Sequence, residues 1–228
     1  MGKITILKDT TKNPITKIGE MAGVCWGADT SDPKKNYNRG IDCISSGHGR
    51  TLEFVNVEMI LDGYSARVIR EWYTHIGGAP TRLQASTRYI NYGEFAYIVP
   101  ESIREKPDAL ECYKDSMQML RQDIEYLIEN ESIPREDAAM LLPLGMTTRV
   151  VDKRNLRNLI DMSRQRMCNR AYWEFRELFN DLSNALIAYS SEWNTIVQSQ
   201  FMAKCDLSHV CKEKHSCGKW PCQESDGQ

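Results

Sequence analysis

The chain has 228 residues, of which 26% are charged and 41% hydrophobic, and its formal net charge is -2 at pH 7. This length suits one globular domain with a real core, and the charge does not favour a protein that holds polyanionic nucleic acid. No stretch approaches the roughly 18 apolar residues of a membrane span, and the N-terminal segment lacks the apolar core of a secretion signal. We therefore expect a cytoplasmic protein that binds neither nucleic acid nor a membrane.

The first third of the chain alternates predicted strands and short helices. In chain order, these are an edge strand at 3–7, helices at 15–25 and 36–46, a central strand at 53–61, and a helix that begins at Ser65. Asp62-Gly63 is expected to break the central strand, and Gly77-Gly78 to form a tightly bent loop.

The rest of the chain is predicted to be mostly helical. The expected elements are extended chain at 81–92, a strand at 95–99, an amphipathic helix at 107–130, a short helix ending at 142–143 and a strand after it. Residues 155–166 and 171–201 are expected to be helical, as one long helix that is disturbed near Asn169. This order predicts a single α+β domain with a central mixed or antiparallel sheet flanked by long helices. We place the domain at 1–203 and a Cys/His-rich tail at 204–228.

The eight cysteines fall into two groups. Cys25, Cys43, Cys112 and Cys168 stand singly in apolar or helical segments, which favours buried, reduced thiols. The tail holds a denser set, namely Cys205, Cys211, Cys217 and Cys222 with His209 and His215. The spacings lack the close pairs of zinc modules, so a metal clip, a redox-sensitive tail and a disordered end all stay open, and no residue is assigned as a metal ligand.

Arg82, Gln84, Ser86 and Arg88 alternate along the predicted extended segment, where alternate side chains face the same way. Guanidinium, amide and hydroxyl groups on one face form a good cradle for phosphate and amide groups, although a solvated strand face is the alternative. For His48 and His75, a structural role is the alternative, and a charged outer helix face explains the arginines at 164–176 equally well.

Taken in order, a set of short motifs resembles the flavin-dependent thymidylate synthases. These motifs are Gly47-His48, Glu53, Asp62-Gly63-Tyr64-Ser65, Arg67, Trp72, His75, Ser86-Thr87-Arg88-Tyr89, Leu142-Pro143-Leu144, Thr148-Arg149, Asn155, Arg157, Leu159, Arg166, and Ala171 to Arg176. The likeness spans residues 25–176 in order and spacing.

The resemblance implies an enzyme that makes thymidylate from deoxyuridylate (dUMP). Methylenetetrahydrofolate would donate the carbon and reduced FAD the hydride, with NADPH reducing the flavin. The family implies a homotetramer whose active sites are shared between subunits, with no cysteine nucleophile.

The resemblance also implies roles for individual residues. His48 and Arg176 would be catalytic, with Arg176 at the pyrimidine edge, where it would stabilise developing charge. The implied substrate-binding residues are Glu71, Arg82, Gln84, Ser86, Thr87, Arg88, Arg149 (from a neighbouring subunit) and Arg176. The implied cofactor-binding residues are Cys25, His48, Arg50, His75, Arg166 and Arg170.

The sequence departs from the family at the segment that opens its signature. Thr74 and Ile76 stand on either side of His75 where the family has arginines, and about three residues are inserted between Gly77 and Arg82. Arg82 or Arg70 would restore part of the charge. The alternatives are a homologue that modifies the pyrimidine differently, for example by hydroxymethylation, one that only binds a nucleotide, and a metal-clipped regulatory or nucleic-acid-binding module.

Overall fold

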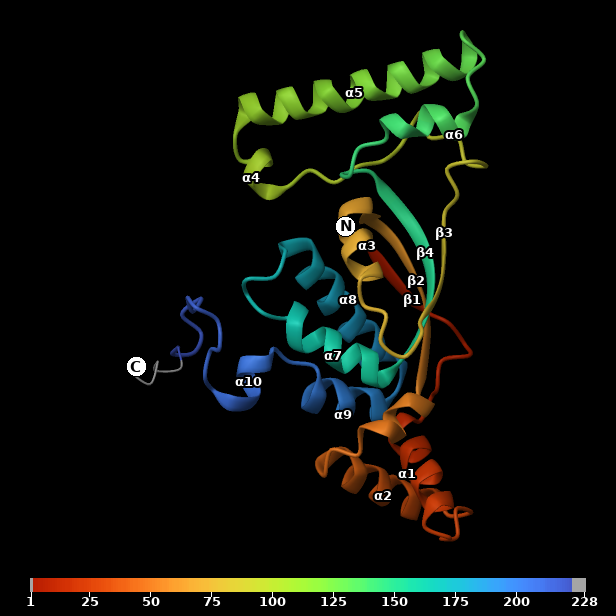
Figure 1. The fold of residues 1–228 in the computed structure, drawn as a ribbon, viewed down its shortest axis with the longest axis vertical. Helices are drawn as coiled ribbons and strands as arrows, with labels where there is room; N and C mark the ends of the chain where they lie inside the picture. Colours follow the sequence, from red (N-terminus) through yellow and green to blue (C-terminus); the bar gives the residue numbers. More distant parts are fainter. Residues whose placement is uncertain (1, 223–228) are drawn as a thin grey trace. The chain divides into compact units, whose positions relative to one another are not determined.

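The structure is a computed structural model that describes residues 2–222 (Figure 1). Its four-stranded antiparallel sheet has the order β1-β2-β4-β3. The strands are β1 (Lys3–Ile6), β2 (Asn56–Ser65), β3 (Thr81–Gln84) and β4 (Thr147–Asn155). The helices are α1 (Pro14–Cys25), α2 (Pro33–Ser45), the 3-10 helix η1 (Gly49–Phe54), α3 (Ala66–Tyr73), α4 (Glu101–Arg104), α5 (Pro107–Glu129), α6 (Arg135–Ala138), the 3-10 helix η2 (Ala139–Leu141), α7 (Leu156–Arg166), α8 (Trp173–Tyr189), α9 (Ser191–Gln200) and α10 (Lys204–Ser208). The predicted α+β class is confirmed.

The described chain divides into two compact units. Unit 1 comprises residues 2–3, 61–74 and 82–151, and unit 2 comprises residues 4–60, 75–81 and 152–222. Both long strands, β2 and β4, contribute residues to each unit. Within residues 2–222, no helix combines the length and apolar character that crossing a membrane needs.

Unit 1 has its own small core, in which the long helix α5 covers the chain before β4. Phe95, Met117, Ile124, Ala138 and Met146 are buried together there. The predicted amphipathic helix at 107–130 and the short helix after it are confirmed by α5 and α6. Apolar residues at three-to-four spacing gave the signal, because α5 buries only one of its faces.

The sheet differs from the prediction at four places. Residues 53–54 belong to η1, and β2 continues past Asp62-Gly63 because Tyr64 and Ser65 are buried and stay in the sheet. The predicted extended segment at 81–92 is wrong beyond Gln84, where the chain turns. The predicted strand at 95–99 is reduced to one bridge between Tyr97 and Met146. In each case tertiary packing overrides local propensity.

The helices of unit 2, and α3 of unit 1, follow the prediction with one exception near the C-terminal end. Ser65, Asp32 and Asn155 accept backbone N–H groups at the starts of α3, α2 and α7, as helix N-caps do. The one long helix expected over 155–201 is wrong. Residues 167–172, where a disturbance was predicted near Asn169, separate α7 from α8, and Ser190 is extended (φ -161°) and separates α8 from α9. The Ser190 hydroxyl then caps α9 by accepting from the Trp193 N–H at 3.3 Å.

Helices α1 and α2 pack against each other in unit 2 at unusually close range (Figure 1). A Cβ at Gly19 would lie 1.8 Å from the Asn36 carbonyl oxygen, and one at Gly40 would lie 2.0 Å from the Ile15 carbonyl oxygen. The two glycines therefore set the separation of the helices, since no larger residue fits between the backbones.

We predict that Gly40→Ala lowers the free energy of unfolding by about 1–3 kcal/mol, as overpacking does in a close-packed interior. Gly49→Ala is the matched control, because a Cβ there would meet Arg157 at 3.6 Å, an ordinary contact. Denaturant unfolding of both variants measures the difference. Equal stability of Gly40→Ala and the wild type would contradict the close packing of α1 and α2.

Candidate ligand-binding site

The C-terminal ends of α1 and α2 have the same backbone motif. At the end of α2, Gly47 has φ +77°, the His48 N–H donates to the Cys43 carbonyl at 2.9 Å, and the Gly47 N–H donates to the Ile44 carbonyl at 3.2 Å. At the end of α1, Gly27 has φ +64° and the Ala28 N–H reaches the Gly23 carbonyl at 3.0 Å. Both are Schellman motifs, in which glycine takes the left-handed position that stops the helix.

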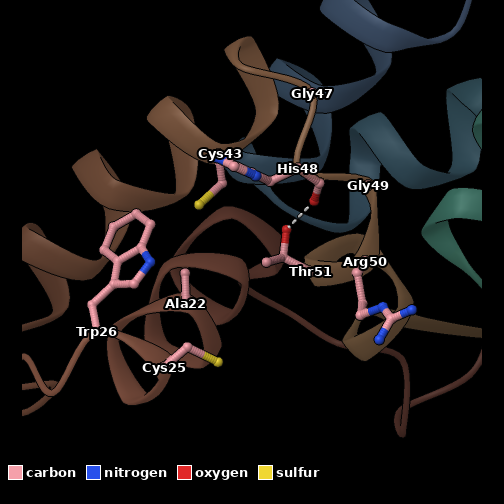
Figure 2. Close-up of a pocket in the computed structure, with 9 residues that line it drawn as sticks. All are labelled: Ala22, Cys25, Trp26, Cys43, Gly47, His48, Gly49, Arg50 and Thr51. Atoms are coloured by element: carbon pink, nitrogen blue, oxygen red, sulfur yellow. Dashed lines mark hydrogen bonds between the residues drawn. The ribbon is translucent and has the colours of Figure 1, made fainter.

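These two helix ends and η1 enclose a cavity of about 320 Å³ (Figure 2). Its lining residues are Ala22, Cys25, Trp26, Cys43, Gly47, His48, Gly49, Arg50 and Thr51. Three of the predicted cofactor-binding residues, Cys25, His48 and Arg50, thus line one cavity. The Thr51 hydroxyl donates to the His48 carbonyl at 2.7 Å and fixes the turn that carries the imidazole.

The chemistry of this cavity suits a planar heterocycle. The indole of Trp26 is 59% exposed, which leaves a large aromatic face open to a ligand beside the small side chains of Ala22 and Cys25. His48 and Arg50 are exposed and add polar and cationic groups. The volume lies near the lower end of roughly 300–1,000 Å³ for ligand pockets, so it accommodates one ring system rather than a whole dinucleotide.

A fourth predicted cofactor residue, His75, lies in the loop at residues 75–81, which belongs to unit 2. The Arg166 Nε donates to His75 Nε2 at 2.9 Å, and the imidazole meets the Phe175 ring edge-on at 5.9 Å between centroids. The Arg166 guanidinium also lies over the Phe175 ring, 4.8 Å from its centroid. Because Nε2 accepts a hydrogen bond, the neutral imidazole carries its proton on Nδ1.

The backbone of His75 is held by a buried network whose residues belong to none of the predicted sites. Arg154 pairs with both carboxylate oxygens of Asp152, at 2.6 and 2.8 Å, and both side chains are fully buried. The same guanidinium donates to Asn158 Oδ1 at 2.7 Å and to the His75 carbonyl at 3.3 Å. The inserted loop also lies on the start of α7, since a Cβ at Gly78 would meet Asn155 Nδ2 at 2.1 Å.

Two predicted cofactor residues, Arg166 and Arg170, line another cavity of unit 2, of about 590 Å³, together with residues of the C-terminal segment. The six predicted cofactor-binding residues therefore all belong to unit 2, but they divide between two cavities and the His75 loop.

The predicted substrate-binding residues, except Arg176, belong to unit 1 and do not share one strand face. The Arg82 guanidinium donates to the Tyr73 carbonyl at 2.9 Å and lies over the Tyr73 ring. Gln84 donates to the Thr148 hydroxyl at 3.3 Å. Ser86 and Thr87 stand at the turn after β3, and Glu71 is half-buried on α3.

The two phosphate-binding candidates of unit 1 are engaged by carboxylates. Arg88 Nε lies 2.7 Å from Glu136 Oε2, and both side chains are largely exposed. Arg149 pairs with Asp62 in the same way. The hydrogen bond to Asp62, and then the charge of that carboxylate, raise the pKa of Arg149 above its ordinary value. An anion that binds either guanidinium competes with its carboxylate partner.

Arg176, the predicted catalytic arginine, lies on α8 in unit 2. Its Nε is buried and finds no hydrogen-bond partner among the residues that the structure describes. Arg176 is not among the residues that line the two cavities above. A buried guanidinium nitrogen without a partner has an unused donor for a ligand.

The single cysteines are less buried than predicted. Cys43 is buried, but Cys25 and Cys112 are exposed, so the prediction of buried thiols is wrong for these two. Cys25 at the end of α1 and Cys112 on α5 fall on the solvent-facing side of their helices, which their positions in the sequence determine. Across residues 2–222, no group of three His, Cys, Asp or Glu side chains is arranged to hold a metal ion.

Comparisons with known proteins identify the class to which this fold and these sites belong. The profile of the family described as "Thymidylate synthase complementing protein" matches residues 6–188, from β1 into α8. The chain belongs to this family. The resemblance to flavin-dependent thymidylate synthases that the motifs indicate is thereby confirmed.

Individual relatives are similar along most of the chain. The flavin-dependent thymidylate synthase of Nitratidesulfovibrio vulgaris is 26% identical over 191 residues, covering 80% of this chain and 76% of that protein. The enzyme of the same name from Clostridium tetani is 25% identical over 205 residues, covering 80% and 81%. Thymidylate synthase X from Helicobacter pylori, solved with FAD and dUMP, has a TM-score of 0.64 at 20% identity over 88% of this chain and 97% of that chain, which shows a shared fold.

We predict that His75 stays neutral well below neutral pH. Burial, then the charges of Arg166 and Arg154, lower its pKa from the usual 6.5 to about 4. The unfolded chain takes up this proton below pH 6.5, whereas the folded chain does not, so His75 makes the fold less stable as the pH falls from about 6.5 to 4.

Denaturant unfolding at pH 7 and pH 5 checks this prediction. The wild type should lose more stability between these two pH values than His75→Gln does. An imidazole proton resonance of His75 that titrates near pH 6.5 would contradict the assignment.

Proposed function

We propose that this chain makes thymidylate by reductive methylation of dUMP. FAD would be the bound cofactor, and NADPH and methylenetetrahydrofolate the co-substrates. The observation that carries the proposal is that Cys25, His48 and Arg50, three residues matched to the family's cofactor site, line one cavity in a chain that belongs to that family. When bound, the flavin would supply the hydride that reduces the transferred one-carbon unit.

The residues of the cavity would bind and orient one ring system of the cofactor. Trp26 would cover an aromatic face, and His48 and Arg50 would contact its polar edge. His75 would remain a neutral hydrogen-bonding group that Arg166 and Arg154 hold in place from its two ends. His75 would not act as a general acid at neutral pH, because its pKa is about 4 and the imidazole is neutral there.

Arg88 and Arg149 would take the dUMP phosphate, with Ser86 beside it. Both arginines are paired with exposed carboxylates, and such a pair is worth only about 0–1 kcal/mol. A doubly charged phosphate would therefore compete well with these carboxylates. Arg176 would face the pyrimidine with its unused Nε donor. In keeping with the family, the active enzyme would be a homotetramer in which a neighbouring subunit supplies Arg149.

A specific observation supports one competing proposal, that the chain binds a nucleotide without turning it over. Thr74 and Ile76 replace the arginines that the family carries around the histidine, and Ile76 is 69% exposed. Arg82, the residue expected to restore charge, is engaged by Tyr73. Incubation of the purified chain with FAD, NADPH, methylenetetrahydrofolate and dUMP separates the proposals. Mass spectrometry should detect thymidylate, whereas nucleotide binding without product would favour the alternative.

We predict that Cys25→Phe weakens FAD binding at least tenfold, because the phenyl ring fills the cavity of about 320 Å³. Val24→Phe is the matched control, since Val24 is 66% exposed and is not among the residues that line the cavity. Quenching of FAD fluorescence measures both affinities. Equal affinities would remove this cavity from the flavin site.

We predict opposite effects on dUMP affinity for the two partners of the exposed ion pair in unit 1. Arg88→Ala should weaken binding about ten- to a hundredfold, as the loss of a charge-assisted hydrogen bond does. Glu136→Gln frees the guanidinium and should tighten binding by up to about fivefold, the value of an exposed pair. Calorimetric titration with dUMP measures both variants. Weaker binding by Glu136→Gln would show that Arg88 does not serve the phosphate.

A further inference from the structure

The C-terminal segment of the described chain forms one side of a cavity, and this side lies outside the residues that match the family. Helix α10 packs against α7, and residues 204–213 line the cavity of about 590 Å³ opposite residues 164–171. The family profile ends at residue 188, so the whole C-terminal side of this cavity lies beyond it. All of these residues belong to unit 2.

The cavity is strongly cationic. Five of its lining residues are basic, namely Arg164, Arg166, Arg170, Lys204 and Lys212, whereas Glu213 is its one acidic lining residue within the described chain. Glu213 is 63% exposed at its side chain and lies 3.9 Å from Arg170, too far for a strong hydrogen bond. The nearby acid of α10, Asp206, is neutralised by Lys219 at 2.7 Å and by the indole N–H of Trp220 at 2.8 Å.

Several of these cations have donors that the described chain leaves unused. The Nε of Arg164 is buried without a hydrogen-bond partner among residues 2–222. Neither Lys204 nor Lys212 forms an ion pair with another described residue, and both are exposed. Arg170, in contrast, donates to the His215 carbonyl at 2.6 Å, which ties the C-terminal segment to the connection between α7 and α8.

We propose that this cavity binds the pyrophosphate group of a nucleotide, and that Lys204 and Lys212 of the C-terminal segment are among its ligands. Clustered guanidinium and ammonium groups around a partly enclosed space favour a multiply charged anion. A volume of about 590 Å³ admits a pyrophosphate with an attached nucleoside. Apart from Gln165 and Val210, the uncharged residues that line the cavity have small side chains, namely Cys168, Ala171, Cys205, Ser208 and Cys211.

This inference rests on the proposed function only for the source of the pyrophosphate. FAD and NADPH both carry the group. Arg166 and Arg170 are matched to the family's flavin residues, but the lysines are not. The two sources are therefore separate arms of the test, and inorganic pyrophosphate is the probe of the shared chemistry.

The test compares Lys204→Gln/Lys212→Gln with the control Lys214→Gln in the full chain. Lys214 is exposed on the same segment but does not line the cavity, and all three substitutions are at the surface, so the fold should be retained. Calorimetric titration with inorganic pyrophosphate, FAD and NADPH measures the affinities. The double variant should bind pyrophosphate at least tenfold more weakly than the control, with the same loss for whichever dinucleotide uses the cavity.

Equal pyrophosphate affinity of the double variant and the control would overturn the inference. So would a loss for pyrophosphate with no loss for either dinucleotide, since the site would then hold an adventitious anion only. Neither result bears on the proposed function, which fails separately if the wild type binds no FAD or makes no thymidylate.

Discussion

The buried ion pair between Arg154 and Asp152 is the constraint on which the candidate cofactor region of unit 2 depends. Both side chains are fully buried, and a buried pair is tolerated only when further hydrogen bonds satisfy the charges. Arg154 meets this requirement by also donating to Asn158 on α7 and to the His75 carbonyl. One guanidinium thus joins β4, α7 and the loop that carries His75, and removing either charge would leave the other uncompensated, at a cost of about 3–5 kcal/mol.

This network accounts for how the chain keeps a candidate cofactor region despite its altered signature. The loop after α3 lacks the flanking arginines, yet Arg154 fixes its backbone and Arg166 fixes the His75 ring from the other side. Positive charge comes instead from α7 and the segment after it, and the basic cavity of unit 2 adds the C-terminal lysines. In unit 1 the arginines matched to the substrate site are held by exchangeable carboxylates.

Local signals in the sequence predicted those parts of the fold that local physics determines. The periodicity of α5 and the start of α3 at Ser65 could be predicted from the sequence, as could the α+β class and the family. Three other features could not be predicted, because they depend on packing between residues far apart in the sequence. They are the extension of β2 past Gly63, the turn after Gln84 and the break at Ser190. The role of Arg154 could not be predicted from the sequence, because it depends on a contact with His75, which is 79 residues away. Trp26 and Glu136 were missed because neither belongs to a recognised motif.

The most direct measurement is the visible absorption spectrum of the purified chain during titration with FAD, followed by addition of dUMP. The account predicts that the bands of oxidised FAD shift as it binds, and shift again when dUMP is added, because nucleotide binding would change the surroundings of the flavin. A spectrum identical to that of free FAD throughout would contradict it. The cavity at the ends of α1 and α2 would then not be a flavin site, and the chemistry of the family could not be assigned to this chain.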